Sequence, residues 1–160
     1  MMKTILLGYG NPYRGDDGVA WHLLTRLLAK YQIEKTDLLE SDIFTLTDSV
    51  DIWFNLQLLP EISEIIAGYD RVIFIDAHTG EIQQNINLQQ VSPQFINSPF
   101  THHVTPSTVL SLTNSIAGKC PESWLLSIRG YKFNFERSLS EDTSQLITKA
   151  LVLLEEDFLI

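Results

Sequence analysis

Carboxylate and imidazole side chains occur in three separate segments of this 160-residue chain, and each segment adjoins a predicted strand or helix. Together with one asparagine, these side chains are, in chain order, Asn11, Asp16, Asp17, Asp76, His78, His102 and His103. Aspartate oxygen and histidine nitrogen together form a donor set that suits a borderline divalent cation such as zinc or nickel. Calcium would require more oxygen ligands than this set offers. A metal site is therefore predicted if the fold brings the three segments together.

The elements that must position these residues alternate between strands and helices. Continuous or alternating apolar patterns predict strands at 2–7, 50–56, 71–76, 86–91 and 124–129, with one strand or two broken pieces within 34–49. Helical spacing and start signals predict helices at 19–31, 60–68, 106–118 and 140–154. Such alternation implies a mostly parallel sheet covered on both faces. We predict one α/β domain over residues 1–160, with three layers and a twisted sheet of about five strands.

In an open parallel sheet, ligands bind beyond the carboxyl ends of the strands. Strand 2–7 leads to the acidic pair, strand 71–76 ends at Asp76, and the histidine pair precedes the helix that Pro106 opens. Each residue also has an ordinary explanation: Asp16 or Asp17 as a helix N-cap, Asp76 as a turn former, and either histidine as a surface loop residue. The convergence of three segments on one edge favours the metal site.

Other chemistries fit these segments less well. The glycines at 8 and 10 are followed by Gly15, which is not the spacing of a dinucleotide-binding loop, and the acidic pair would repel a phosphate at the helix start. A Cys120–histidine nucleophile pair remains open, although no local signature surrounds Cys120. A dyad of Asp17 and Asp76 would require the two carboxyl groups to approach within a few ångströms.

Composition excludes several classes of protein. The chain has 11 basic and 20 acidic residues, a formal charge of −9, and no Lys/Arg cluster, which disfavours nucleic-acid binding. No apolar run approaches the roughly 18–20 residues of a membrane span, and the apolar run near the start is too short for a signal peptide. The single cysteine excludes an internal disulfide and suits a reducing compartment. We expect a cytoplasmic protein that binds neither nucleic acid nor membrane.

Four segments resemble, in order, motifs of the [NiFe]-hydrogenase maturation endopeptidases. The most specific is the glycine- and aspartate-rich loop at 8–18, and the others are 57–61, 72–77 and 102–106. They read, in order, GYGNPYRGDDG, QLLPE, VIFIDA and HHVTP. The chain departs from some members in lacking a G-G-T segment after the second strand, where 34–49 has different sequence.

The resemblance implies a peptidase that removes the C-terminal extension from the nickel-loaded large-subunit precursor of a [NiFe] hydrogenase. It implies that Asp17, Asp76 and His102 bind the metal and act in catalysis, with His103 as the alternative ligand. Asn11, Asp16 and Gln57 are the expected substrate-binding residues.

The expected metal is nickel, held by the enzyme or supplied by the precursor, with zinc or another divalent ion able to substitute in vitro. The precursor is the expected partner of a monomeric enzyme. The alternatives are a non-catalytic nickel- or precursor-binding chaperone of the same fold and, more distantly, an unrelated α/β hydrolase.

Overall fold

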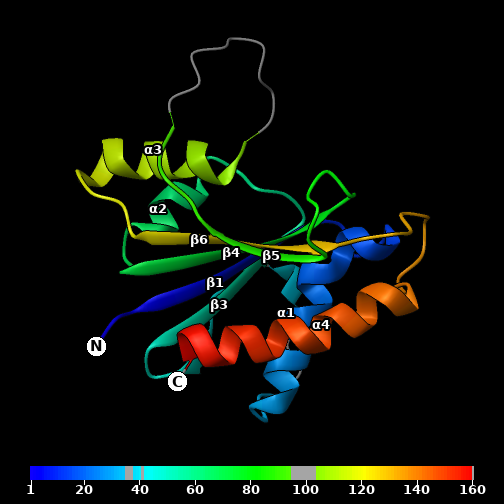
Figure 1. Ribbon diagram of the computed structural model, residues 1–160. Coiled ribbons are helices and arrows are strands. Elements are labelled where there is room, and N and C mark those ends of the chain that lie inside the picture. The colour runs from blue at the N-terminus through cyan, green and yellow to red at the C-terminus, as the bar shows by residue number, and fades with distance from the viewer. Residues whose placement is uncertain (35–37, 41, 95–103, 160) are drawn as a thin grey trace.

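A six-stranded sheet in the order β2-β3-β1-β4-β6-β5 forms the middle layer of the protein (Figure 1). The computed structural model describes residues 1–34, 38–40, 42–94 and 104–159. The strands in these ranges are β1 (Thr4–Tyr9), β2 (Phe44–Thr47), β3 (Val50–Asn55), β4 (Arg71–His78), β5 (Ile86–Gln90) and β6 (Glu122–Arg129). The four inner strands β1, β3, β4 and β6 run parallel, and both edge strands are antiparallel to their neighbours.

Helices cover both faces of this sheet, as predicted (Figure 1). One face carries α1 (Val19–Lys30) and α4 (Glu141–Leu154), and the other carries α2 (Ile62–Ile66) and α3 (Pro106–Ala117). Alternate side chains of β1 enter the two cores: Leu6 packs on the side of α1 and α4, and Ile5 and Leu7 on the side of α2 and α3. The doubly buried strands explain the continuous apolar runs in the sequence.

The sheet differs from the prediction in its number of strands, with six instead of about five. The ambiguous segment 34–49 contributes a short 3₁₀ turn at Leu38–Glu40 and the edge strand β2, which pairs with β3. An edge strand of four residues, half-buried and with one neighbour, leaves little hydrophobic pattern in the sequence. Strand β1 also runs two residues further than predicted, because Gly8 pairs with both Phe54 and Ile75 and Tyr9 pairs with Asn55.

The helix boundaries follow local signals in two cases and depart from them in two. Thr105 and Ser140 cap α3 and α4 through their side-chain oxygens, and Gly118 ends α3 in the left-handed conformation. Helix α2 is shorter than the predicted 60–68. Neither aspartate caps α1; a 3₁₀ turn at Gly15–Gly18 intervenes, and Gly18 is the N-cap. Within the described ranges, no helix combines the length and apolarity needed to cross a membrane.

The order of connections places a crevice between β1 and β4. The chain passes from β1 through α1 to the β2–β3 hairpin on one side of β1, and then through α2 on the opposite face to β4 on its other side. Strand order therefore changes direction at β1 and β4. Ligand sites of open α/β sheets lie beyond the carboxyl ends of the strands at such a point.

Candidate functional site

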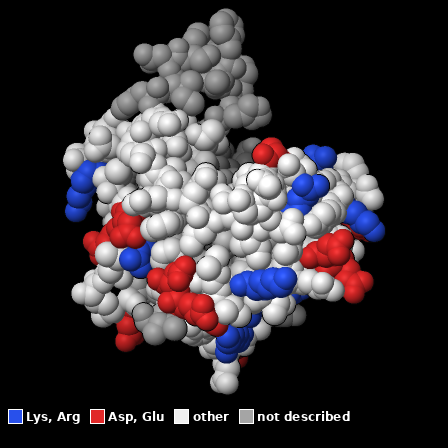
Figure 2. All heavy atoms as spheres, viewed as in Figure 1, with Lys and Arg blue, Asp and Glu red and all other residues white. Residues whose placement is uncertain are grey.

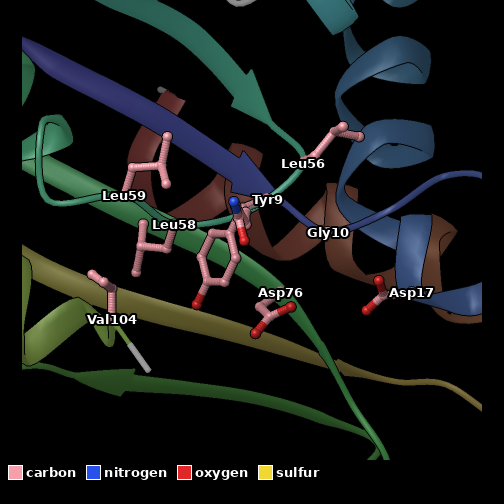
Figure 3. A pocket seen from close by; sticks show the side chains of 9 residues that line it. Tyr9, Gly10, Asp17, Leu56, Leu58, Leu59, Asp76 and Val104 are labelled. Carbon is pink, nitrogen blue, oxygen red and sulfur yellow. The ribbon is translucent and has the colours of Figure 1, made fainter. Parts of the chain in front are cut away.

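A cavity of about 470 Å³ lies at this point, beyond the ends of β1, β3 and β4 (Figure 3). Its walls come from the end of β1, the turn before α1, the segment after β3, the end of β4, and Val104 just before α3. The lining residues are Tyr9, Gly10, Asp17, Leu56, Gln57, Leu58, Leu59, Asp76 and Val104. The structure thus brings together three residues predicted from the sequence: Asp17, Asp76 and Gln57.

The Asp17 carboxylate is held in the cavity wall by the backbone of its own loop. Its Oδ2 accepts a hydrogen bond of 2.8 Å from the Asn11 N–H. Gly10 allows this close folding: its φ is +133°, and a Cβ there would lie 2.2 Å from the Asp17 carbonyl oxygen. The spacing of Gly10, Asn11 and Asp17 is therefore a requirement of the loop geometry that presents the carboxylate.

The Asp76 carboxyl group lies near the end of β4, where its Oδ1 accepts a 2.7 Å hydrogen bond from the Ala77 N–H. Burial is the main cause that raises the pKa of Asp76 to about 7, and the negative charge of Asp17 adds to the rise. Hydrogen bonds from the Ala77 N–H and the Tyr9 hydroxyl oppose it. Asp76 therefore exchanges its proton near neutral pH, as a general acid or base requires.

Tyr9 is a site residue that the sequence analysis missed. Its ring lines the cavity near Asp76 (Figure 3), and its hydroxyl forms a side-chain hydrogen bond with the Asp76 carboxyl group. Burial, followed by the charge of Asp76, raises the pKa of Tyr9 well above its ordinary value, so the hydroxyl stays protonated and acts as a donor at neutral pH. Tyr9 was hidden because strand β1 was expected to end at residue 7; extending it through Gly8 would have placed Tyr9 at the strand end.

Asp16, expected to bind substrate, does not line the cavity. Its side chain is fully buried and accepts five hydrogen bonds from the segment after β6 and the start of α4. The donors are Tyr131 N (2.8 Å), Lys132 N (2.9 Å), Ser140 N (2.7 Å), Ser140 Oγ (2.7 Å) and Thr143 Oγ1 (2.9 Å). Burial opposes ionisation, yet these bonds hold the pKa of Asp16 below its ordinary value. The placement gives Asp16 a structural task, which is to hold the Gly10–Gly18 loop against α4.

Asn11 and His78 also make structural contacts. The Asn11 Oδ1 accepts a 2.9 Å bond from the Tyr13 N–H, and Asn11 is not among the lining residues. His78 is buried, and its Nε2 donates to the Gln84 carbonyl at 2.9 Å while its Nδ1 accepts from the Gly80 N–H at 3.2 Å. Both ring nitrogens of His78 are therefore engaged in closing the turn after β4.

Two carboxylates at one cavity offer oxygen donors of the kind that divalent cations accept. In the described part of the chain, no group of three His, Cys, Asp or Glu side chains completes a metal site. The predicted third ligand, His102, and its alternative, His103, lie outside the described residues. Val104, the next residue along the chain, lines the cavity. Of the three predicted metal ligands, the structure describes two, Asp17 and Asp76, and both line the cavity.

Cys120 is remote from this cavity. It directly precedes Pro121 and β6, at the amino end of the parallel strands, where it borders a smaller cavity with Lys119 and Tyr69. Asp17 and Asp76 lie at the carboxyl end. Cys120 therefore does not belong to the site of Asp17 and Asp76, and its pairing with His102 or His103 involves residues outside the described ranges.

Several solved structures with the same fold are hydrogenase maturation proteases or endopeptidases. No family model matches the sequence, and no curated protein does. The hydrogenase-maturating endopeptidase HybD from E. coli matches with a TM-score of 0.68 and 18% identity, covering 98% of this chain and 94% of HybD. The [NiFe] hydrogenase maturation protease HycI from Thermococcus kodakarensis matches with a TM-score of 0.66 and 21% identity, covering 97% and 91%. A hydrogenase 2 maturation peptidase from a Thaumarchaeota archaeon matches with a TM-score of 0.62 and 18% identity, covering 96% of both chains. These likenesses establish the fold and agree with the motif resemblance.

Proposed function

We propose that this protein is an endopeptidase that removes the C-terminal extension from the nickel-loaded large-subunit precursor of a [NiFe] hydrogenase. The observation that carries the proposal is that Asp17 and Asp76, from two distant motifs, line one cavity at the switch point of the sheet. The fold shared with solved maturation endopeptidases supports the same activity. The sequence motifs that resemble those of maturation endopeptidases also predict Asp17 and Asp76 as site residues.

The two carboxylates have different tasks in this reaction. The Asp17 carboxylate is fixed by the Asn11 N–H and lines the cavity. Asp76, whose pKa is about 7 in the metal-free protein, gives up its proton readily when a divalent cation binds. The Tyr9 hydroxyl donates a hydrogen bond to the Asp76 carboxyl group and so orients it. Gln57 and the leucines at 56, 58 and 59 form the wall along which the extended tail binds.

Nickel enters this scheme as part of the substrate. Asp17 and Asp76 supply oxygen ligands, and His102, or His103 in its place, supplies the nitrogen. A bound divalent ion polarises a carbonyl or activates water. An enzyme that owned its metal would contain about one ion per chain and would cut an isolated tail peptide. We expect instead a metal-poor protein that cuts the nickel-loaded precursor and leaves the nickel-free precursor intact.

The test compares both forms of the precursor. Purified protein is incubated with nickel-loaded and with nickel-free precursor, and the mass of the large subunit is followed over time. Shortening of the loaded form alone supports the proposal. Binding without shortening would instead support the chaperone alternative. Equal cutting of both forms, together with tightly bound zinc in the enzyme, would contradict the assignment of nickel to the substrate.

A further inference from the structure

Four exposed side chains, Tyr13, Arg14, Phe135 and Arg137, form a patch beside the turn that carries Asp17, and we call them the arginine–aromatic patch. The Arg14 guanidinium carbon lies 6.0 Å from the centre of the Phe135 ring, and that of Arg137 lies 4.6 Å from the Tyr13 ring. Phe135 is 90% exposed. Aromatic residues and arginine are both enriched in protein interfaces, and here they are grouped on one exposed surface.

The patch is built on loops, yet its backbone is fixed. Arg14 forms a β-bridge with Glu136, and the Gly15 N–H donates to the Glu136 carbonyl at 2.8 Å. Below it, the buried Asp16 carboxylate ties this loop to residues 131–132 and to the start of α4. A surface that is already ordered loses less conformational entropy when it binds.

The charge of the patch is opposite to that of the chain. Arg129 and Lys132 lie on the same segment, and one exposed carboxylate, Glu136, lies among these cations. In the described ranges, the ion pairs of the protein lie elsewhere, and none includes Arg14 or Arg137. Across the face in Figure 2, acidic and basic groups alternate in small clusters without a large region of one sign. The patch is therefore a local positive site on a protein of charge −9.

We infer that the arginine–aromatic patch is the docking surface for the folded body of the precursor, and that the precursor meets it with carboxylates around an apolar side chain. This inference rests on the proposed function. The Asp17 N–H donates to the Arg14 carbonyl at 3.2 Å, so the patch and the cavity share one turn. The tail of the precursor occupies the cavity, and the adjoining body covers the patch.

The variants Arg14→Glu/Arg137→Glu and Phe135→Ala test this inference. The controls are Lys119→Glu and Ile116→Ala, at two exposed positions, one just after α3 and one in its last turn. For the nickel-loaded precursor, the charge-reversed patch variant raises KM by ~10–100-fold with kcat within about twofold, because docking charges act on association and affinity. Phe135→Ala, at a side chain that is 90% exposed, raises KM by about tenfold as a hot-spot truncation does. The control variants leave both constants unchanged.

A second measurement distinguishes binding of the precursor's folded body from binding of its C-terminal tail. The isolated tail peptide, followed by chemical-shift changes of the enzyme, binds the wild type and both patch variants equally if the patch contacts the body. Unchanged KM in the patch variants, equal effects in the controls, or loss of tail-peptide binding in the patch variants would each overturn the inference while the wild type still cuts. A wild type that does not cut the precursor identifies failure of the proposed function itself, and the inference falls with it.

Discussion

Asp16 and Asp17 are neighbours in the chain, but their carboxylates face different surroundings. Asp16 is fully buried and accepts five hydrogen bonds from the start of α4 and the segment before it, whereas Asp17 lines the cavity and accepts one from the Asn11 N–H. The 3₁₀ turn at Gly15–Gly18 makes this divergence possible, because successive side chains of a tight turn point in different directions. Of the two acidic residues in the motif, Asp16 therefore stabilises the structure and Asp17 belongs to the site.

Asp16→Asn is expected to destabilise the protein by roughly 2–4 kcal/mol, since an amide nitrogen in the Oδ1 position would face the Ser140 N–H, and one in the Oδ2 position would face the Tyr131 and Lys132 N–H groups. Either orientation leaves a buried backbone donor unsatisfied. Denaturant unfolding at pH 7 measures this change in the free energy of unfolding. Asp48→Asn, at an exposed position, is the matched control and should change stability by less than about 0.5 kcal/mol. An Asp16→Asn protein as stable as the wild type would contradict the structural role.

The same residue predicts acid sensitivity. The folded-state pKa of Asp16 lies below its unfolded value, so the folded state binds fewer protons at this site. Its contribution is fully present above about pH 4 and is lost as the pH falls through the folded-state pKa. Between pH 5 and pH 2.5, the stability of Asp16→Asn should therefore decline less steeply than that of the wild type. Parallel curves for the two proteins would contradict this prediction.

Asp76 predicts a pH dependence of opposite sign in the metal-free protein. Its folded-state pKa of about 7 lies above the unfolded value, so its contribution to stability is greatest below about pH 4 and is lost as the pH rises to about 7. Carboxyl carbon chemical shifts of Asp76, recorded with a chelator present, give its pKa directly. Asp17→Asn should lower that pKa by removing a negative charge, and Tyr9→Phe should raise it by removing a hydrogen bond. Shifts of the same sign in both variants would contradict the assigned geometry.

Gly10→Ala is expected to disrupt the Asp17 turn, because the new Cβ would meet the Asp17 carbonyl oxygen at 2.2 Å in a conformation with positive φ. Gly118→Ala is the matched control, since Gly118 also has a positive φ of 73° but no atom lies within 4 Å of its Cβ position. We expect Gly118→Ala to cost about 1 kcal/mol of unfolding free energy and Gly10→Ala several times as much. Thermal and denaturant unfolding compare the two variants. Equal losses of unfolding free energy would show that the close contact at Gly10 has no effect on stability.

The sequence predicted most of the fold because the buried strands and capped helices carry strong local signals. Strand β4 is a continuous apolar run, and α3 begins at Thr105-Pro106 and ends before Gly118, so its bounds could be read residue by residue. Strand β2 could not be predicted with the same precision. Its position depends on pairing with β3, which is a tertiary contact. Four residues are too few to show a hydrophobic periodicity in the sequence.

The candidate site was predicted in part for the same reason. Asp17 and Asp76 follow strand ends, and the carboxyl ends of parallel strands share one edge of a sheet, so topology alone brought them together. Which member of the acidic pair faces the cavity depends on a 3₁₀ turn and on donors from 131–143, more than a hundred residues away. Tyr9 was missed because glycine neighbours obscured the end of β1. The roles of His102 and His103 stay predictions.

Asp17→Asn and Asp76→Asn are each expected to lower cleavage of the nickel-loaded precursor by at least about 100-fold, in line with the loss of a general acid–base group or a charged site residue. Asp48→Asn should cut at the wild-type rate. Unfolding measurements on each variant separate loss of chemistry from loss of fold, because neither Asp17 nor Asp76 carries the five-bond network of Asp16.

The peptidase activity is tested most directly by the intact mass of the large subunit after incubation of the nickel-loaded precursor with the wild type, Asp17→Asn or Asp76→Asn. We expect the loss of one C-terminal fragment with the wild type, and a precursor of unchanged mass with either variant although both variants remain folded. A precursor left intact by the folded wild type, or shortened equally by all three proteins, would contradict it.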